Sequence, residues 1–478
     1  DGKYTIDVSG MTAPFMLSAQ GTVGGNSYTW HSAATAADVN GTVNVTPLTD
    51  LIVANVAGQI AANVYASGNF STMTAADLAA AETALQAKIQ PMLDALGVGA
   101  GIDLLRASFN ADHTGLDRVL DALRVEVNTT TAVATITNII DNSATTDALA
   151  NKTDVGTTIT ATNVATGMNA FDQVVAGFNT FTALFATALP SSANTTLLGL
   201  FDQTNFVQDG ANFALFLNEI TTDQTMVGIK FTNVSLDSMD TTTGIAKVTF
   251  TPVSKDGKIQ EPMQFQLNRS TADTTKWLAV GNQRKAKVEA RSFARLQDCF
   301  INNALQTDII ETGLEFSILD IGGFGTTVQA DYAIVTGPGL PTNGVLYVNR
   351  DGPGNDFRAA SGNYKGAAAT AGFETCGHSQ VPLNATAISA IADNDIYTVK
   401  LYDDAGSVDT TTGEAVLTAI PTGDTLLDTD TSSIGKKPYL VTGVLTKASF
   451  AAITAPTKTA LTTFATNGGT TSVTWTLP

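Results

Sequence analysis

Blocks with the periodicity of β-strands alternate along this chain with blocks that have the periodicity of α-helices. Strand-like sequence occupies residues 1–46, 125–166 and 298–455, whereas helix-like sequence occupies 47–124 and the first part of 167–297. A two-residue alternation of apolar and polar side chains suits a half-buried sheet, and a spacing near 3.6 residues suits one face of a helix. The pattern predicts a multidomain α+β fold that is mostly β.

The composition excludes several classes of protein. A length of 478 residues exceeds one core and predicts two to four domains. Hydrophobic residues make up 44% and charged residues 14%, which indicates folded domains with weakly charged, Thr-rich surfaces. The formal net charge of -19 argues against nucleic-acid binding by bulk electrostatics. No apolar run reaches the length of a transmembrane segment.

Two cysteines, Cys299 and Cys376, lie far apart in the sequence. A disulfide between them is our preferred interpretation, because neither has a second Cys or His at the spacing of metal ligands. The alternative is two separate buried thiols. A disulfide would place the protein outside the cytoplasm, in an extracellular or cell-surface location.

The first 46 residues predict short strands separated by glycine-rich turns. The expected strands are Tyr4–Val8, Pro14–Ala19, Ser27–Ser32 and Thr42–Val45. The segment DGKYTIDVSG at the start resembles the C-terminal half of a carboxypeptidase-regulatory-like β-sandwich. In that family two or three strands precede this turn, and here they are absent, so the resemblance implies a partial sandwich.

The next block predicts a helical domain. Thr46 is the expected N-cap of a first helix with Pro47 at its first position, followed by helical sequence over Leu51–Ala66. Further helices are expected over Thr74–Leu96, where Pro91 predicts a break, and over Ile102–Phe109 and Leu116–Leu123. The block looks like the helical insert of bacterial surface lipoproteins. Beyond it, Val125–Ile140 predicts a hairpin and Thr157–Thr162 one more strand.

Residues 167–297 place helices before a long antiparallel sheet. The amphipathic segment Phe171–Leu189 comes first, and four strands are expected over Met226–Leu236, Ile245–Val253, Ile259–Leu267 and Lys276–Gln283, with Lys287–Leu296 as a candidate fifth. With Leu200-Phe201-Asp202 and Lys276-Trp277-Leu278, the order resembles the cone-like fold of the nuclear-transport-factor-2-like family. That resemblance implies an interior pocket, but Phe250, Phe265 and Trp277 at inward positions favour a filled core.

Residues 298–455 return to strands, expected over Leu314–Leu319, Ala330–Thr336, Gly344–Asn349, Tyr397–Tyr402 and Ala415–Ala419. The pattern is similar to a β-sandwich of immunoglobulin or fibronectin type, although the Cys–Trp–Cys signature of antibody domains is absent. The repeated phrase at Asp240–Gly244 and Asp409–Gly413 predicts two hairpin tips. Residues 456–478 resemble the opening strands of a fibronectin type III domain.

These assignments give six segments. They are a partial β-sandwich at 1–46, a helical domain at 47–124, a hairpin and linker at 125–166, a cone-like α+β domain at 167–297, a β-sandwich at 298–455, and partial fibronectin-like strands at 456–478.

Catalytic motifs are missing from the sequence. It holds no nucleophile elbow, no P-loop and no dinucleotide fingerprint, so we expect a protein that is not an enzyme and has no cofactor. Its three histidines, His31, His113 and His378, are not at metal-ligand spacing from one another and are interpreted as structural. Calcium is the one metal suggested, by acidic turns around Asp351, Asp393 and Asp403–Glu414, but the last lacks the EF-hand ligand pattern and solvated turns are commoner than calcium sites.

One cationic run stands out in this acidic chain. It consists of Arg284, Lys285, Lys287, Arg291 and Arg295. The run is interpreted either as a solvated face with local acidic partners or as a contact with an acidic surface of another copy.

Strand-like sequence stands at both ends of the chain. A strand needs a neighbour for its backbone hydrogen bonds, and none is available in sequence beyond either end. We expect these strands to pair with other copies through Tyr4, Ile6 and Val8 at one end and Val473, Trp475 and Leu477 at the other. The equal alternative is that the sequence is a window on a longer modular protein.

The leading functional hypothesis is a non-enzymatic extracellular structural protein. It would be a subunit of a bacterial surface filament, a homopolymer assembled by donation of a strand from one copy to the next. The alternative hypothesis is a ligand-binding or sensing surface lipoprotein with a pocket in residues 167–297.

Overall fold

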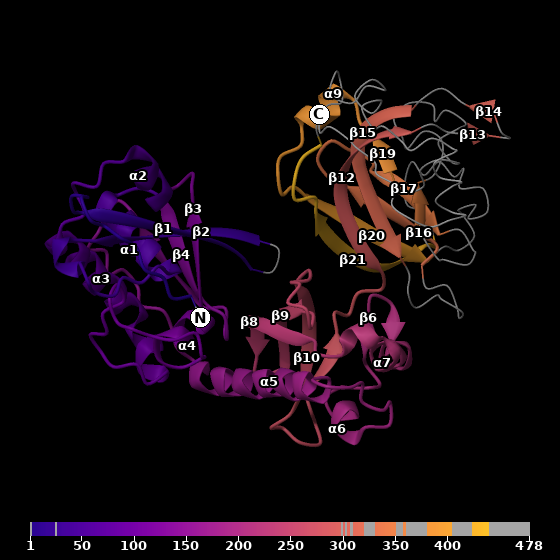
Figure 1. Cartoon of the computed structure of the whole chain (residues 1–478), viewed down its shortest axis with the longest axis horizontal. Coiled ribbons are helices and arrows are strands. Elements are labelled where there is room, and N and C mark those ends of the chain that lie inside the picture. Colours follow the sequence, from indigo (N-terminus) through magenta and orange to yellow (C-terminus); the bar gives the residue numbers. More distant parts are fainter. Residues whose placement is uncertain are drawn as a thin grey trace, which may run out of the picture. The chain divides into compact units, whose positions relative to one another are not determined.

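A computed structural model describes residues 2–23, 26–297, 300–301, 304–305, 309–319, 330–349, 357–359, 380–403 and 423–438. Within these residues, eight α-helices and several small antiparallel sheets form a mixed α+β structure, which confirms the predicted class at this level. The chain divides into two compact units (Figure 1). Unit 1 comprises residues 1–206 and 216–282, and unit 2 comprises residues 207–215 and 283–478.

Unit 1 begins with a two-stranded hairpin of β1 (Phe15–Val23) and β2 (Asn26–Ala34), followed by the short 3-10 helix η1 (Ala36–Asp38). The strand predicted over Tyr4–Val8 is wrong, because these residues form no ladder. Within the described structure β1 and β2 pair only with each other, and residues 4–8 do not add to either edge. The Tyr4 hydroxyl instead donates to the carbonyl oxygen of Val43.

A group of helices follows the hairpin. They are α1 (Pro47–Ala57), α2 (Ala61–Ser67), α3 (Ala75–Ala95) and α4 (Gly115–Ala122). The predicted cap is confirmed, since Thr46 accepts a hydrogen bond from the backbone N–H of Thr49 with Pro47 at the first position. The single helix predicted over 51–66 is instead two helices, because Gly58 at φ +66° ends α1 in a left-handed conformation. Pro91 lies inside α3 and does not end it.

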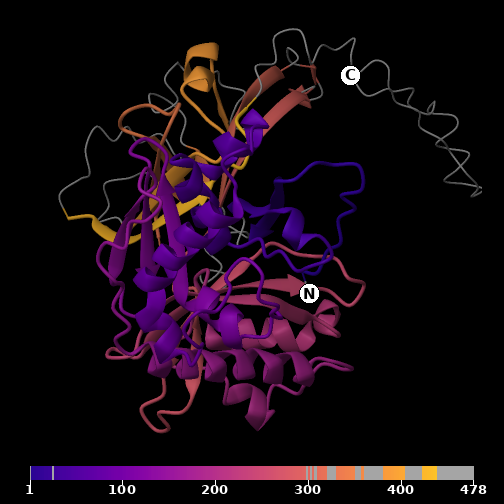
Figure 2. The same ribbon diagram turned by 90° about the vertical axis from the view of Figure 1, so that its left-hand side faces the viewer.

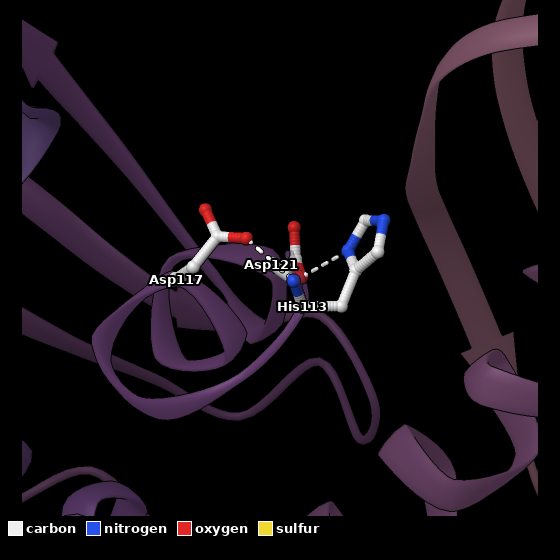
Figure 3. Close-up of side chains that lie close together, drawn as sticks. All are labelled: His113, Asp117 and Asp121. Atoms are coloured by element: carbon white, nitrogen blue, oxygen red, sulfur yellow. Dashed lines mark hydrogen bonds and ion pairs between the residues drawn. The ribbon is translucent and has the colours of Figure 1, made fainter. Parts of the chain in front are cut away.

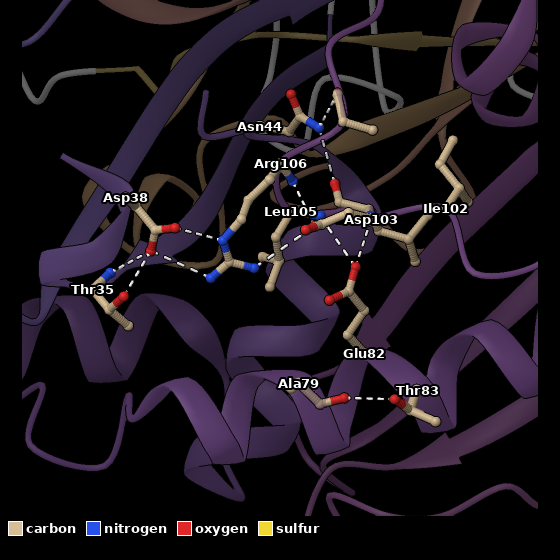
Figure 4. Close-up of polar contacts among 12 residues, drawn as sticks. Thr35, Asp38, Asn44, Ala79, Glu82, Thr83, Ile102, Asp103, Leu105 and Arg106 are labelled. Atoms are coloured by element: carbon tan, nitrogen blue, oxygen red, sulfur yellow. Dashed lines mark hydrogen bonds and ion pairs between the residues drawn. The ribbon is translucent and has the colours of Figure 1, made fainter. Parts of the chain in front are cut away.

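The helix predicted over Ile102–Phe109 and the strand predicted over Thr42–Val45 are both wrong. The two segments are joined to each other in irregular conformation (Figure 4). Asn44 donates from its side chain to the carbonyls of Leu104 and Ala107, at 3.1 and 2.8 Å, and its backbone N–H donates to Leu105. Glu82 of α3 accepts from the N–H of Leu104 at 2.5 Å. These side chains satisfy the backbone groups that a helix or sheet would have paired.

A three-stranded sheet completes this part of unit 1. It consists of β3 (Leu123–Asn128), β4 (Val133–Asn138) and β5 (Ala144–Ala148), in that order. The hairpin predicted over 125–140 is confirmed by β3 and β4, and β5 was not predicted. The strand predicted over 157–162 does not form, and Ile159 there donates its N–H to the carbonyl of Lys88 on α3.

The rest of unit 1 places a long helix against a four-stranded sheet. The helices are α5 (Val164–Leu184), α6 (Thr195–Leu198), α7 (Phe213–Thr222) and the 3-10 helix η2 (Gln224–Met226), of which α7 starts within the unit 2 segment 207–215. The sheet has the order β11 (Trp277–Gly281), β10 (Met263–Arg269), β9 (Ile245–Val253), β8 (Lys230–Asp240). In both views α5 covers one side of this sheet (Figure 2). Asp240–Gly244 forms the predicted hairpin tip between β8 and β9.

Unit 2 contains two larger sheets that share one hydrophobic core. The first sheet is β12 (Lys287–Gln297), β15 (Ile309–Leu319) and β19 (Gln380–Pro382). The second is β18 (Phe357–Ala359), β17 (Val345–Asn349), β16 (Tyr332–Thr336), β20 (Ile396–Asp403) and β21 (Thr425–Ser433). Val288 and Phe316 of the first sheet are buried in the same cluster as Val335 and Tyr347 of the second.

The remaining elements of unit 2 are short. They are two strand pairs, β6 (Val207–Gln208) with β7 (Ala211–Asn212) and β13 (Phe300–Ile301) with β14 (Ala304–Leu305), and the helix α9 (Ala385–Ser389). β12 pairs with β15 along its whole length, so the interpretation of Lys287–Leu296 as a fifth strand of the preceding sheet is wrong. Among the described residues, no helix combines the length and the apolar character needed to cross a membrane.

Candidate assembly surface

The residues predicted to make contacts between copies fall into two groups. Tyr4, Ile6 and Val8 are described, and Tyr4 and Ile6 are exposed although they form no strand. Val473, Trp475 and Leu477 lie outside the described residues. So do both cysteines of the predicted disulfide, His378, and the predicted strand and hairpin tip at 415–419 and 409–413. Those expectations stay predictions.

The outer half of the β1–β2 hairpin has the property that was expected of the chain ends, namely strands whose backbone can pair with a strand of another copy. We call residues 18–21 of β1 and 28–30 of β2 the hairpin arm. All of them are exposed except Trp30, which is half-buried. The sheet has two strands, so within the described structure each strand has one edge without a neighbouring strand. Such an edge presents free backbone N–H and C=O groups that can pair with another strand.

No Asp, Glu, Lys or Arg occurs anywhere in residues 15–34. Natural proteins commonly protect an exposed edge with charged side chains, particularly Lys, or with Pro, a bulge or a covering segment. Here the register is regular from Phe15–Ala34 to Val23–Asn26. The edges of the hairpin arm therefore lack both the charged side chains and the bulge that would discourage pairing.

One face of the hairpin arm carries two aromatic rings. Tyr28 and Trp30 are two residues apart, so they lie on the same face of β2, with ring centroids 5.5 Å apart. The residues opposite them on β1 are Gly21 and Ala19. This face of the hairpin arm therefore carries two aromatic rings opposite two small residues, and no charged side chain.

The base of the hairpin is fixed to the helices by buried polar contacts. His31 is 2% exposed, and its Nδ1 lies 2.7 Å from Oδ1 of Asp50 on α1. The backbone N–H of His31 donates to the same carboxylate at 2.8 Å, and the Thr49 hydroxyl donates to the His31 carbonyl at 3.0 Å. Burial raises the pKa of Asp50, against the lowering effect of the His31 hydrogen bond and charge. The hairpin arm thus extends from a rigid support.

A second polar group holds the turn after β2. Arg106 Nε donates to Oδ1 of Asp38 at 2.5 Å, and the N–H of Thr35 donates to the other carboxylate oxygen at 2.6 Å (Figure 4). Burial would raise the pKa of Asp38, but the hydrogen bonds from Arg106 and Thr35 keep that pKa below its usual value. Sequence reasoning missed this contact because Arg106 and Asp38 are distant in sequence.

A His/Asp cluster near α4 is the second candidate site (Figure 3). Nδ1 of His113 lies 2.7 Å from Oδ2 of Asp121, and the His113 N–H donates to Asp117 at 2.7 Å. The three residues are half-buried, and their ligand-type atoms lie within 4.8 Å of one another. They could hold a metal ion, but the ring nitrogen that faces the carboxylates is already engaged by Asp121. His113, Asp117 and Asp121 are spaced i, i+4, i+8, which is the signal in the sequence for this cluster. It is missed when only the spacing of the histidines from one another is considered.

The expected pocket of residues 167–297 is occupied by aromatic side chains. The predicted inward residues Phe250, Phe265 and Trp277 are buried, as expected. The ring centroid of Phe178 on α5 lies 4.7 Å from that of Phe250 in a tilted arrangement, and the ring of Phe250 lies 5.1 Å from that of Phe265. Rings at these distances fill the space between helix and sheet.

The cationic run has acidic neighbours within unit 2. Arg284 lies 3.3 Å from Asp430, Lys287 lies 2.5 Å from Glu289, and Arg291 lies 2.9 Å from Glu315. Three charges of the run therefore have local acidic partners, as expected from the interpretation of the run as a solvated face.

Comparison with known proteins identifies no relative of the chain. A scan against protein-family models, a search of curated proteins and a search of solved structures each gave no match.

Proposed function

We propose that the chain is a non-enzymatic extracellular structural protein, a subunit of a bacterial surface filament or appendage whose copies associate by strand addition. The observation that carries the proposal is the uncharged, exposed hairpin arm on a rigid base. Main-chain hydrogen bonds along an added strand supply affinity, and side-chain pockets on alternate positions supply specificity.

Among the described strands, the hairpin arm has two different edges without a neighbour, one on β1 and one on β2. Pairing β1 of one copy with β2 of the next is a heterologous contact, which propagates in one direction when it does not close into a ring. Repetition of that contact produces a filament. The predicted contacts at Tyr4, Ile6, Val8, Val473, Trp475 and Leu477 would add to it.

The finer fold assignments belong to the same proposal. We assign unit 2 to a β-sandwich of immunoglobulin or fibronectin type, supported by two antiparallel sheets that share a core. We assign the part of residues 167–297 that lies in unit 1 to a cone-like domain, supported by α5 beside a four-stranded antiparallel sheet. Chained modules of this kind suit an extended surface protein. The ring-filled interior weighs against the alternative of a ligand-binding lipoprotein.

The test replaces Gln20 on the exposed edge of the hairpin arm with lysine. Purified full-length chain at high concentration is examined by negative-stain electron microscopy and sedimentation. We expect wild-type filaments or oligomers, and we expect Gln20→Lys to abolish them because an edge lysine blocks strand pairing. The substitution also lowers the net negative charge, so a loss of association cannot come from increased repulsion between copies.

The matched control is Gln59→Lys, which makes the same chemical change at an exposed turn after α1. This variant should assemble as the wild type does. Single particles of wild-type protein at every concentration would contradict the proposal, as would full assembly of the Gln20→Lys variant.

A further inference from the structure

A fully buried lysine meets two carboxylates between α3 and β5 of unit 1. Lys88 of α3 is 0% exposed, and Asp147 of β5 is 1% exposed. Lys88 Nζ lies 2.8 Å from Oδ2 of Asp147 and 3.0 Å from Oδ2 of Asp154, which follows β5. Lys88 is 59 and 66 residues away from the two aspartates in sequence, and the fold brings it to them.

The hydrogen bonding of this group is complete at the lysine but not at Asp147. Nζ has three acceptors, because the Thr146 carbonyl oxygen lies 2.9 Å away in addition to the two carboxylates. The second oxygen of Asp147, Oδ1, is buried and has no hydrogen-bond partner among the residues that the structure describes. A buried carboxylate with an oxygen left unpaired is costly, and such an atom in a native structure requires an explanation.

We propose that Lys88 and Asp147 become joined by an intramolecular isopeptide bond. The Nζ amine attacks Cγ of Asp147, a C–N bond forms, and one C–O bond of the carboxyl group breaks. The ammonium supplies both hydrogens of the water that leaves and the carboxylate supplies its oxygen, so atoms and charge balance without an oxidant, an activating group or a cofactor. The amide is neutral, which removes two buried charges and leaves a single carbonyl oxygen in place of the carboxylate.

Asp154 is placed to transfer the protons of this reaction. Its carboxylate contacts Nζ, and its side chain is 25% exposed, unlike those of Lys88 and Asp147. It can accept a proton from the ammonium, which frees the nitrogen lone pair, and return that proton to the departing oxygen. Burial of the other two groups keeps the amine and the carboxyl in contact and excludes competing water.

The bond would tie α3 covalently to the three-stranded sheet. It goes beyond the proposed function, since it concerns the interior of one copy and not contacts between copies. A covalent connection of this kind resists forced separation of the two elements, a property that suits a load-bearing surface subunit.

The experiment is the intact mass of the full-length chain under denaturing conditions, followed by peptide mapping. The expected mass is that of the sequence less one water molecule, after any disulfide has been reduced. Digestion should release one branched peptide that contains both Lys88 and Asp147. A chain with the full sequence mass and two separate linear peptides would overturn the proposal, whatever the outcome of the filament test.

Two variants assign the chemistry. Lys88→Arg keeps the positive charge but cannot form the amide, so it should have its full sequence mass; a missing water in this variant would overturn the assignment to Lys88. Asp154→Asn retains the hydrogen-bonding shape without the base, and it should accumulate the uncrosslinked form. Bond formation in Asp154→Asn at the wild-type rate would overturn the role of Asp154. If either variant fails to fold, the wild-type mass alone decides whether the bond exists.

Discussion

The acidic side chains around His113 change its pKa. The hydrogen bond to Asp121 raises the pKa of His113, with further raising by the charges of Asp121, Asp117 and Asp172, against the lowering effect of burial. Because the folded pKa lies above the unfolded value of about 6.5, the resulting stability is fully present below that value. It is lost as the pH rises through the raised folded pKa.

The measurement is an NMR titration of the imidazole signals, which are assigned with His113→Gln. We expect the midpoint of His113 to fall in Asp121→Asn. The control is Asp94→Asn on α3, an exposed position that changes the net charge equally and has no contact with His113 in the structure. A His113 midpoint at or below its ordinary value in the wild type would contradict the prediction.

Local sequence signals predicted the role of a single residue correctly where its hydrogen-bond partner is near in sequence. Thr46 was predicted as a cap and a helix was predicted to start at Thr74, and each of these threonines accepts a hydrogen bond from the N–H three residues on. The contacts of Asn44, Glu82 and Arg106 could not be found this way, because each depends on a loop brought close by the packing of α3. The hairpin arm was missed for a related reason. Its strands were predicted, but their exposure depends on which other elements pack against them, and the local sequence does not show this.

The helix α5 contains two glycines that should respond in opposite ways to the same substitution. A Cβ at Gly167 would lie 2.6 Å from Cγ2 of the buried Ile140, whereas a Cβ at Gly177 meets nothing within 4 Å. We expect Gly167→Ala to destabilise unit 1 by about 1–3 kcal/mol through overpacking. Gly177→Ala should stabilise it by about 0.5–1 kcal/mol, because alanine is the better helix former.

Urea denaturation followed by circular dichroism measures both variants of α5. The two glycines share one helix, so each variant is the control for the other. Equal shifts in the same direction would mean that helix propensity alone sets the result and that Gly167 does not pack against Ile140 as described.

Elements with strong periodicity were predicted closely, and those decided by tertiary contacts were not. The strand Ile245–Val253 was predicted with the bounds that the structure has, because its alternation is regular and a turn precedes it. The short polar strand β5 was missed, since Thr145 and Asp147 are the side chains it buries. Pro91 was expected to break α3, but it lies near the end of a helix whose packing on α1 maintains it.

At the scale of the whole chain, sequence order and spatial grouping differ. Residues 207–215 belong to unit 2 although unit 1 residues flank them on both sides. Within unit 2, the Gln283 N–H donates to Val207 and the Gly210 N–H donates to Arg284. A division of the sequence into consecutive segments cannot reveal such an exchange, because no composition change marks it.

The net charge of -19 per chain makes a prediction about association. Copies repel one another at long range, and the screening length falls from about 30 Å at 0.01 M salt to about 8 Å at 0.15 M. The hairpin arm itself carries no charged residue, so added salt removes repulsion without weakening an ion pair in the proposed contact. We expect association of the full-length chain, followed by light scattering, to be faster by about tenfold at the higher salt concentration. The Gln20→Lys variant should show no association at either concentration. Slower wild-type association at higher salt would mean that ion pairs, and not an uncharged strand edge, join the copies.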